Sequence, residues 1–452
     1  MTRKDFLKTI SAASFAATPS LYGKMRPDEQ AAHDCHGKFY VDPGLGLLDS
    51  NPFLQTPAED SVGVAFAVTA LASGYAEVAD NPEMKGAVRF RSEGFPYSPA
   101  DSRILQVRIT GLKPGTRYWY RVGAAAMGRP IGYWTKQSEI QWSDVHTFLT
   151  SGISAPSHFA AITDTHGKSA ALRLILKKMR NISAPVSVWT GDVPPSLIDE
   201  EETAVKLFLK QLPGDAGLAS DAPCFFLSGN HDYRGQWYQQ NPYRIMMARR
   251  AEERSVRDLA LCRNFAVRQG DIAMIGLETG EDKPDSHPAH GGNAHFEKYR
   301  AMQADWLRDQ FKRPEIASAP YVVAFCHIPL FDARPEANPG NILENWADYQ
   351  KECADQWGPI LTENGVQLVV CGHKHKLRFD PADSGRSWAQ IVGGGPELGY
   401  VGWGPNKRPD STRFPTVVEG KVEAGKLVVR AHNVLSGTVA ACYEFAPRKC
   451  SF

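Results

Sequence analysis

The pattern of apolar and polar positions along the chain changes near Ser157. Across residues 62–150, apolar side chains alternate with small or polar ones, as at Val64, Phe66 and Val68. A period of two is that of a half-buried strand, so this region is predicted to be all-β. Beyond Ser157, short apolar runs take turns with stretches of helical spacing. This order predicts a layered α/β domain after the all-β one.

The second region divides into predicted strands and helices. Short apolar runs predict strands over residues 158–163, 186–190, 224–227, 321–325 and 366–371. Apolar residues spaced three and four apart predict helices over residues 168–180, 201–212, 243–259 and 296–311. Open α/β sheets bind ligands beyond the carboxyl ends of their strands, so polar residues that follow these strands are candidates for one shared site.

The first region contains a turn with a distinctive string. Two alternating runs flank Pro114 and Gly115, and residues 144–149 are predicted to form the closing strand. The string Leu-x-Pro-x-Thr-x-Tyr, which ends at Tyr118, is similar to the corner of fibronectin type III domains. In those domains the tyrosine begins a strand and its hydroxyl bonds back to the chain upstream. We therefore expect a fibronectin type III-like β-sandwich over residues 60–151.

The N-terminus has the features of an export signal. Arg3 and Lys4 precede a short apolar run of small residues over 10–17. This pattern predicts a signal peptide over residues 1–24, similar to a twin-arginine signal with Lys4 in place of the second arginine. An amphipathic N-terminal helix is the alternative. Residues 25–59 are expected to form an extended arm, and the protein is expected to be exported, to the periplasm or outside the cell.

Composition narrows the range of partners. The chain has 452 residues, which at about 150 residues per domain suggests two or three domains. Its net charge of +1 gives no global electrostatic case for binding nucleic acid or an anionic membrane, and no apolar run is long enough to span a bilayer. The eight cysteines include no C-x-x-C pair, which argues against a zinc ribbon. Cys442 and Cys450 are candidates for a small disulfide loop, but the sequence does not settle their pairing.

Five of the predicted strands end in residue types that bind metals. The five groups are Asp164-Thr165-His166, Gly191-Asp192, Gly229-Asn230-His231-Asp232, Cys326-His327 and Gly372-His373-Lys374-His375. Asp-x-His and Gly-Asp recur elsewhere in the chain, whereas Gly-Asn-His-Asp is rare in any sequence of this length. The joint order of the groups, each at a strand end, predicts a metal site.

Any single histidine has a simpler interpretation as a hydrogen-bonded structural imidazole. We keep that interpretation for the histidines outside the ordered groups: His36, His146, His158, His287 and His432.

With these motifs in order, residues 157–375 resemble the calcineurin-like metallophosphoesterases. Together with the fibronectin-like region in front, the chain resembles the layout of purple acid phosphatases. The resemblance implies a four-layer α/β metallophosphoesterase sandwich, two sheets flanked by helices, over residues 157–452.

The same resemblance implies roles for individual residues and two divalent metal ions, with Mn, Fe and Zn as candidates. The first metal would be held by Asp164, His166, Asp192 and His375. The second would share the bridging Asp192 and add Asn230, His327 and His373. Asn230 and His231 would face the substrate, with His231 as general acid, and Asp232 would orient His231.

The chemistry of these residue types fits that scheme. Carboxylate, imidazole and amide ligands together suit borderline divalent metals. Two such ions clamp the oxygens of a phosphoryl group and activate a water between them. The leaving alkoxide then needs a proton, which a positioned imidazole such as His231 is suited to give. A neighbouring carboxylate, Asp232, is expected to favour the protonated imidazole.

The chain also departs from the purple acid phosphatase pattern. Pro195 stands where those enzymes have a tyrosine three residues after the bridging aspartate, so the violet colour is expected to be absent. Arg334 is a candidate for binding a phosphate oxygen, with a solvated loop charge as the alternative. The loop over residues 282–295 is a candidate lid. Trp237 and Tyr238 are candidates for an aromatic wall, with simple packing as the alternative.

Three functions remain in view. The first is a secreted phosphatase that hydrolyses small phosphate monoesters. The second uses the same metal site on phosphodiesters or nucleotides. The third is a binding protein in which the fibronectin-like region does the work and the α/β domain is catalytically dead. A dead domain is expected to have lost metal ligands, and none of the predicted ones is missing from this sequence.

Overall fold

The computed structural model describes residues 46–92, 97–127, 137–211, 219–241, 244, 261, 263–332, 347–401 and 406–448 of the chain. The predicted signal peptide, most of the predicted arm, Arg334, Cys450 and all but one residue of the helix expected over 243–259 lie outside this range. Within it, no helix combines the length and the apolar character needed to cross a membrane.

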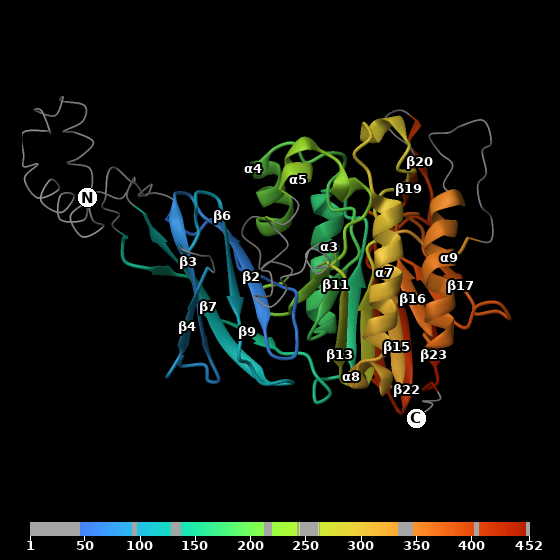
Figure 1. Ribbon diagram of the computed structural model, residues 1–452, viewed down its shortest axis with the longest axis horizontal. Helices are drawn as coiled ribbons and strands as arrows, with labels where there is room; N and C mark the ends of the chain where they lie inside the picture. Colours follow the sequence, from blue (N-terminus) through green and yellow to red (C-terminus); the bar gives the residue numbers. More distant parts are fainter. Residues whose placement is uncertain are drawn as a thin grey trace, which may run out of the picture.

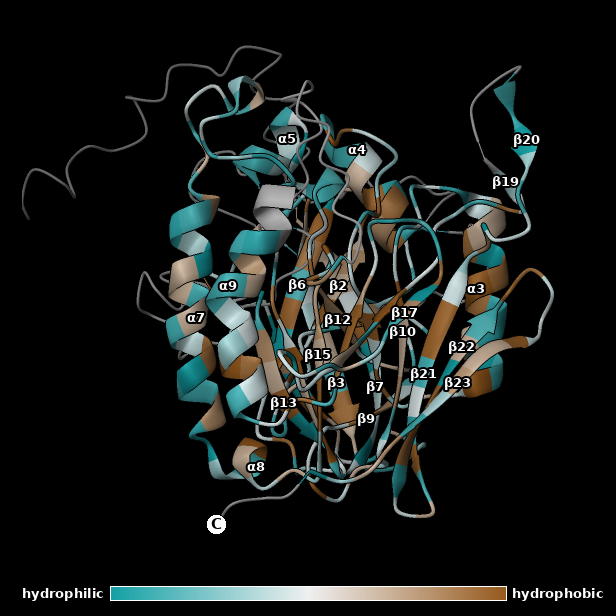
Figure 2. Cartoon of the chain, turned by 90° about the vertical axis from the view of Figure 1, so that its right-hand side faces the viewer, coloured by the Kyte–Doolittle hydropathy of each residue, from teal (hydrophilic) through white to brown (hydrophobic). Residues whose placement is uncertain are grey.

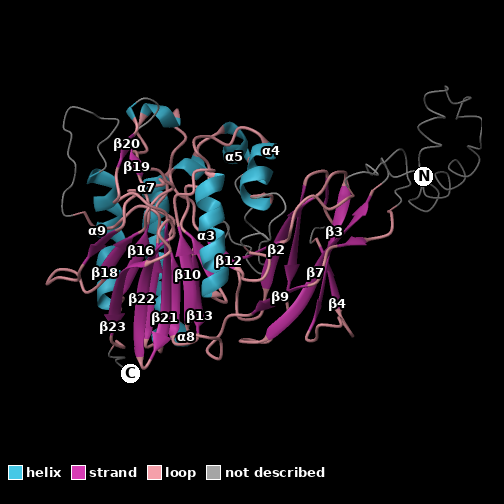
Figure 3. Ribbon diagram, turned by 180° about the vertical axis from the view of Figure 1, so that it is seen from behind, coloured by secondary structure: helices cyan, strands magenta, loops and turns pink. Residues whose placement is uncertain are grey.

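We call residues 53–149 the front part of the molecule. Two antiparallel layers of strands pack face to face there, and strands are the only regular elements among its described residues (Figure 3). One face is made by β1 (Phe53–Gln55), β2 (Val62–Ala67) and β6 (Ile104–Ile109). The other is made by β3 (Ala72–Ala79), β4 (Val88–Arg91), β7 (Arg117–Ala126) and β8 (Gln141–Trp142), with β5 (Ala100–Asp101) and β9 (His146–Leu149) beside them. Phe66, Val107, Tyr120 and Val122 are among the buried residues that fill the space between the sheets.

The rest of the chain forms two further layers of strands. The first contains β10 (His158–Ile162), β11 (Ser187–Trp189), β12 (Cys224–Phe226), β21 (Thr416–Glu423), β22 (Lys426–Asn433) and β23 (Val439–Phe445). The second contains β13 (Phe265–Gln269), β14 (Ile272–Gly276), β15 (Tyr321–Phe325), β16 (Leu368–Cys371), β17 (Arg378–Asp380) and β18 (Ala389–Val392). A two-stranded ribbon pairs β19 (Tyr400–Val401) with β20 (Arg408–Pro409).

Helices cover the outer faces of these two sheets (Figure 1). On one side lie α3 (Ser169–Ile182), α4 (Glu201–Ala204), the π-helix η2 (Val205–Leu209) and α5 (Gln236–Gln240). On the other lie α7 (Phe296–Phe311), α8 (Pro314–Ala317) and α9 (Ala347–Glu363). Figure 2 shows brown, apolar strands inside and teal, polar positions on α7 and α9.

Alternate side chains of β10 point to opposite faces of its sheet, and each face packs against another layer of the domain. Phe159 and Ala161 point into the core between the two sheets, whereas Ala160 and Ile162 belong to the core under α3. Both sets are buried, because the strand is covered on both faces. The order helices, sheet, sheet, helices is the four-layer α/β sandwich that the sequence resemblance implied.

One sheet continues from the front part into the α/β part. Its strand order is β23-β22-β21-β10-β11-β12-β1-β2-β6, so β1 joins β12 to the front strands. Gln55 is paired with Cys224 in parallel register, and the Leu54 N–H donates to the Ala219 carbonyl at 2.9 Å. The Tyr120 hydroxyl adds a buried bond to the Ser220 carbonyl at 2.7 Å. Residues of the predicted arm thus supply a strand of the main sheet.

Candidate metal centre

The five predicted motifs meet at one edge of the two stacked sheets. β10, β11 and β12 are parallel neighbours, and they lead into Asp164-Thr165-His166, Asp192 and Asn230-His231. β15 and β16 are parallel neighbours in the other sheet, and they lead into His327 and His373-Lys374-His375. Parallel neighbours end at the same edge, which is why residues more than 200 positions apart converge.

A first group of possible ligands consists of Asp164, His166, Asp192 and His375, whose ligand atoms all lie within 4.8 Å of one another. Nε2 of His166 is 2.9 Å from Nε2 of His375 and 3.5 Å from Oδ2 of Asp192. Oδ1 of Asp164 is 3.3 Å from Nε2 of His375. The first three residues are buried and His375 is partly exposed.

A second group consists of Asp192, His327 and His373, again with ligand atoms within 4.8 Å of one another. Asn230 joins it, because its Oδ1 lies 3.1 Å from Nε2 of His327 and 3.0 Å from Nδ1 of His373. The structure therefore brings together all seven residues that the sequence predicted as ligands.

Asp192 belongs to both groups through a single oxygen. Its Oδ2 is 3.5 Å from Nε2 of His166 and 3.4 Å from Nε2 of His327. Its Oδ1 accepts a hydrogen bond from the backbone N–H of His231 at 2.9 Å, which fixes the orientation of the carboxylate. This placement would allow one carboxylate to contact two cations at once.

In three of the histidines, Nδ1 lies beside an oxygen acceptor that belongs to neither group of possible ligands. Nδ1 of His166 lies 3.0 Å from the carbonyl of Pro194, and Nδ1 of His327 lies 2.7 Å from the carbonyl of Thr190. Nδ1 of His375 lies 2.7 Å from a carboxylate oxygen of Glu397. An acceptor at Nδ1 keeps the proton there and leaves Nε2 free to bind a metal.

The backbone is strained at the same residues. Nine non-glycine residues of the described part have positive φ, and five of them are possible ligands: Asp164, His166, Asp192, His373 and His375. Left-handed backbone is unfavourable for residues with a Cβ and persists only where surrounding contacts impose it. Its concentration at this edge indicates a functional site.

Two glycines of the motifs allow the chain to pass closely here. A Cβ on Gly191 would lie 2.1 Å from the backbone nitrogen of Gly229. A Cβ on Gly229 would lie 2.3 Å from Oδ1 of Asp192 and 2.8 Å from Cε1 of His327. These close contacts explain why the Gly-Asp and Gly-Asn-His-Asp motifs have glycine at positions 191 and 229, where a side chain would clash.

The charges of the cluster favour a cation between its carboxylates. Burial disfavours the charged imidazole of His327, but the charge of Asp192 outweighs it and raises the pKa of His327 to about 9. Burial acts in the same direction on His375, where the neighbouring carboxylates of Asp164 and Glu397 raise the pKa to about 10. Burial disfavours the charged carboxylate of Asp192, yet the charge of His327 lowers its pKa below the ordinary range.

The residues present therefore fit a pair of divalent metal ions. Oδ1 of Asp164 is buried and has no hydrogen-bond partner among the described residues. Protonated imidazoles supply the positive charge of the cluster. A metal ion that bound to the same ring nitrogens would have to replace their protons. The donor set of carboxylate, imidazole and amide oxygen suits borderline divalent metals.

Asp232 does not contact His231 in the way that the sequence suggested. Its carboxylate accepts hydrogen bonds from the backbone N–H groups of Asp192 and Gly229, both at 2.7 Å, and of Val193 at 3.2 Å. Nδ1 of His231 has no partner among the described residues. Burial, more than any charge, lowers the pKa of His231 to about 4. Asp232 thus orients the backbone of the site, and the expected stabilisation of a protonated His231 by Asp232 is wrong.

A cavity of about 280 Å³ lies over the centre, and we call it the metal cavity. It is lined by Asp192, Asn230, His231, Arg234, Asp282, Lys283, His373 and His375. His231 is therefore beside the possible ligands without belonging to either group. Arg334, the predicted phosphate-binding residue, lies outside the described residues.

Sequence reasoning missed three polar residues of this site. Arg234 and Lys283 bring two cations to the metal cavity, and each is paired with Glu281 and Asp282. Arg234 follows the Gly-Asn-His-Asp motif by two residues, which is a signal that could have been used. Glu397 gives no such signal, because it lies 22 residues after His375.

Most of the remaining sequence candidates make structural contacts, and Tyr238 also lines a cavity. Trp237 packs against the core under α3, in line with the packing alternative. Tyr238 is 3% exposed, and its hydroxyl lies 3.2 Å from Oγ of Ser228. His158 and His432 both contact Glu419, as expected of structural imidazoles.

Comparisons with known proteins agree with this geometry. Residues 157–377 match the family described as calcineurin-like phosphoesterase. Purple acid phosphatase 15 of Arabidopsis thaliana is 22% identical over 317 residues, which cover 65% of this chain and 53% of the relative. The chain thus spans about half the length of that relative.

A solved structure shows the same fold. Purple acid phosphatase PPD1 from yellow lupin (Lupinus luteus) seeds superimposes with a TM-score of 0.62 at 14% identity, over 87% of this chain and 74% of the lupin one. At that identity the likeness concerns the fold alone. The matched segment and the fold agree, and residues 157–377 carry a calcineurin-like phosphoesterase domain.

Proposed function

We propose that this protein is a metal-dependent phosphoesterase that hydrolyses phosphate monoesters at a centre of two divalent ions. The observation that carries the proposal is the position of Oδ2 of Asp192, between Nε2 of His166 at 3.5 Å and Nε2 of His327 at 3.4 Å. Asp164, His166 and His375 would complete one metal site with Asp192, and Asn230, His327 and His373 would complete the other. When bound, the two ions supply an activated water and neutralise charge on the phosphoryl group.

The side chains of the metal cavity have separate tasks in this proposal. Arg234 and Lys283 lie at the wall of the cavity, where a phosphoryl oxygen would compete for them with their carboxylate partners Glu281 and Asp282. Asn230 has its oxygen among the second group, so its amide NH₂ remains available for hydrogen bonding, and it now lies 3.3 Å from Oδ2 of Asp282. His231 faces the cavity without belonging to either ligand group, and the negative charge of a bound phosphate ester would have to raise its pKa from about 4 for the imidazole to give a proton to the leaving oxygen.

Charge favours monoesters over diesters. A phosphate monoester carries up to two negative charges at neutral pH, whereas a diester carries one. The metal cavity, with a volume of about 280 Å³, suits the smaller group, and two divalent ions bound there would attract the more highly charged one. Hydrolysis of phosphodiesters, including nucleotide diesters, by the same centre is the second candidate, and a nucleoside monophosphate counts among the monoesters. A catalytically dead binding protein is disfavoured because no predicted ligand position is missing or displaced.

The front part supports a second element of the proposal. We infer that residues 60–151 form a fibronectin type III-like domain, because two sheets enclose one core there and the backbone N–H of Lys113 donates to the Tyr118 hydroxyl at 3.0 Å. The basic and apolar N-terminal pattern supports export of the protein. Detection of an uncleaved N-terminus on protein confined to the cytoplasm would contradict export.

The test of the function compares two chromogenic esters. Metal-free protein is loaded with Mn, Fe or Zn, and hydrolysis of 4-nitrophenyl phosphate and of bis(4-nitrophenyl) phosphate is measured at equal concentrations. We expect metal-dependent hydrolysis with the higher kcat/KM on the monoester. A higher value on the diester would favour the second candidate, and no hydrolysis by protein that carries two ions would favour the third. The loaded protein is expected to be free of a violet band, since Pro195 replaces the tyrosine.

A further inference from the structure

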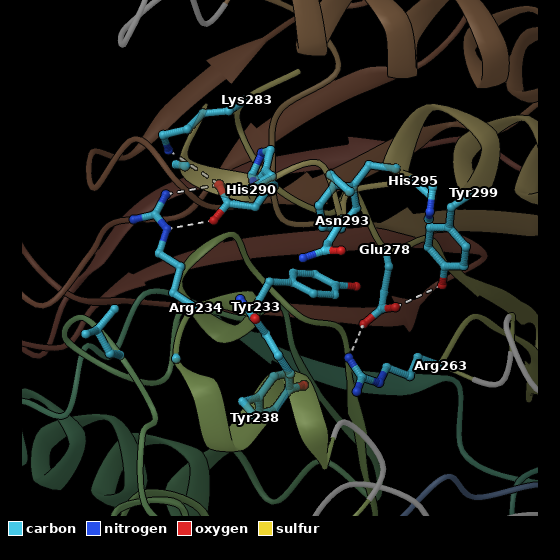
Figure 4. Close-up of a pocket in the computed structure, with 17 residues that line it drawn as sticks. Tyr233, Arg234, Tyr238, Arg263, Glu278, Lys283, His290, Asn293, His295 and Tyr299 are labelled. Carbon is cyan, nitrogen blue, oxygen red and sulfur yellow. Dashed lines mark hydrogen bonds and ion pairs between the residues drawn. The ribbon is translucent and has the colours of Figure 1, made fainter. Parts of the chain in front are cut away.

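A second cavity, of about 860 Å³, adjoins the metal cavity. We call it the side cavity. Arg234 and Lys283 line both cavities, so the two share a wall. The other lining residues are Leu197, Tyr233, Gly235, Tyr238, Gln239, Arg263, Glu278, Glu281, Ala289, His290, Asn293, Ala294, His295, Phe296 and Tyr299. Figure 4 shows Tyr233 among them, between Arg234 on one side and Glu278 with Tyr299 on the other.

A short turn joins the two cavities. The 3-10 helix η3 (His231–Tyr233) presents His231 to the metal cavity and Tyr233 to the side cavity. In the proposed reaction His231 protonates the leaving oxygen of the ester. The alcohol that carries this oxygen is therefore close to the side cavity, which is the larger of the two spaces.

One wall of the side cavity is aromatic. Tyr233, Tyr238, Phe296 and Tyr299 line it. The rings of Tyr233 and Phe296 meet edge to face with centroids 5.1 Å apart, and those of Tyr233 and Tyr238 do so at 6.5 Å. Such a set of fixed rings is a suitable surface for stacking another flat ring.

The cations of the side cavity already have carboxylate partners. Arg263 lies 3.5 Å from Glu278, and both side chains are almost fully buried. Arg234 lies 2.7 Å from Glu281, and Lys283 lies 3.4 Å from the same carboxyl group. A ligand with several negative charges would have to displace these pairs, so an uncharged group is the better fit.

The rim offers hydrogen-bonding groups instead. The side chains of Asn293 and His295 make no hydrogen bond to the described part of the chain. Nε2 of His290 is buried and has no hydrogen-bond partner there either. Asn293 and His295 are exposed and therefore hydrated. An uncharged ring with polar edges would replace the hydrogen bonds of the water that it displaces, whereas a plain alkyl chain would not.

We propose that the side cavity holds the alcohol part of the ester, and that this alcohol is an uncharged ring system with hydrogen-bonding edges, such as a nucleoside. The inference rests on the proposed phosphoesterase function and adds the class of substrate. It excludes both inositol polyphosphates and small alkyl phosphates as preferred substrates.

A matched pair of variants on α5 tests the proposal. Gln239 and Gln240 are adjacent and exposed, but only Gln239 lines the side cavity. Gln239→Trp narrows the cavity, and Gln240→Trp adds the same bulk outside it. The probes are adenosine 5′-monophosphate, glycerol 1-phosphate and inositol hexakisphosphate, with kcat/KM measured on metal-loaded protein.

The wild-type protein is expected to prefer adenosine 5′-monophosphate to glycerol 1-phosphate by about tenfold or more, as stacking of one base allows. Gln239→Trp should lower this preference about tenfold, and Gln240→Trp should leave it unchanged. Adenosine, which has no phosphate, should bind to the wild-type protein and to Gln240→Trp in calorimetry, and bind much more weakly to Gln239→Trp.

Two outcomes would overturn the proposal while hydrolysis remains. One is a preference that is equal in the two variants, and the other is a wild-type preference for inositol hexakisphosphate or glycerol 1-phosphate. Absence of hydrolysis of every ester by protein carrying two ions would instead refute the proposed function, and adenosine binding would still report on the side cavity by itself.

Discussion

Glu397 holds the Nδ1 nitrogen of His375 at 2.7 Å, and this contact orients a histidine that no neighbouring backbone carbonyl orients among the described residues. The first prediction follows from it. Glu397→Gln should weaken metal binding at the first site by about 10–100-fold, because the amide is a poorer acceptor for the Nδ1 proton. Titration with a competing chelator measures the affinity. Glu363→Gln, at an exposed position on α9, is the control. Equal affinity in the two variants would contradict the role of Glu397.

A second prediction concerns the shared carboxylate. Asp192→Ala should lose both ions, because its Oδ2 is close to His166 and to His327. His166→Ala should lose chiefly the ion of the first group, since His166 belongs to that group alone. Metal analysis after gel filtration gives the number of ions per chain. Two tightly held ions in Asp192→Ala would show that the bridge has been assigned to the wrong residue.

The third prediction separates proton donation from metal binding at His231. His231→Asn should retain two ions and lose about 10²–10⁴ in kcat on an alkyl phosphate. The loss should be much smaller on 4-nitrophenyl phosphate, because 4-nitrophenolate leaves without a proton. His146→Asn, in β9 of the front part, is the control variant. Equal losses on the two esters, or loss of an ion, would mean that His231 is not the proton donor.

A fourth prediction concerns stability in acid. Hydrogen bonds from His158 and then His432 hold the pKa of Glu419 well below its ordinary value of 4.5. A lowered pKa means that the unfolded state binds the proton more tightly, so the contribution of Glu419 is present above pH 4.5 and is lost as the pH falls further. Arg430 adds to the attraction.

Glu419→Gln should therefore be less stable than the wild-type protein near neutral pH, and the difference should shrink in acid. Denaturant unfolding at about pH 6 and at about pH 3 measures the two free energies. Glu444→Gln, which removes an exposed glutamate from β23, is the matched control. A difference between wild type and Glu419→Gln that is constant with pH would contradict the assignment.

The ligand residues could be predicted because chemistry and position coincide in the sequence. Asp164, Asp192, Asn230, His327 and His373 each come directly, or within a few residues, after a buried strand. A parallel sheet then brings them to one edge without further information. The strands at 158–163, 321–325 and 366–371 and the helix at 296–311 were predicted for a similar reason, since their apolar periods are regular.

Other parts depend on contacts that adjacent residues do not encode. The carboxylate of Asp232 accepts a hydrogen bond from the backbone N–H of Asp192. The sequence suggested a contact with His231 instead, because the two residues are adjacent in the chain. Strands β21 and β22 carry charged residues at exposed positions and were not predicted. The helix expected over 201–212 is divided, because a π-helical turn replaces its second half from Val205 to Leu209.

The strand order of the main sheet also limits how the molecule can be divided. Because β1 lies between β12 and β2, cutting the chain at residue 60 would remove a strand from the α/β part and leave the edge of β12 without a partner. Such open edges promote aggregation. The front part therefore cannot be removed as a separate unit. Exchanging it between homologous proteins would require the segment around Phe53–Gln55 to remain with the α/β part.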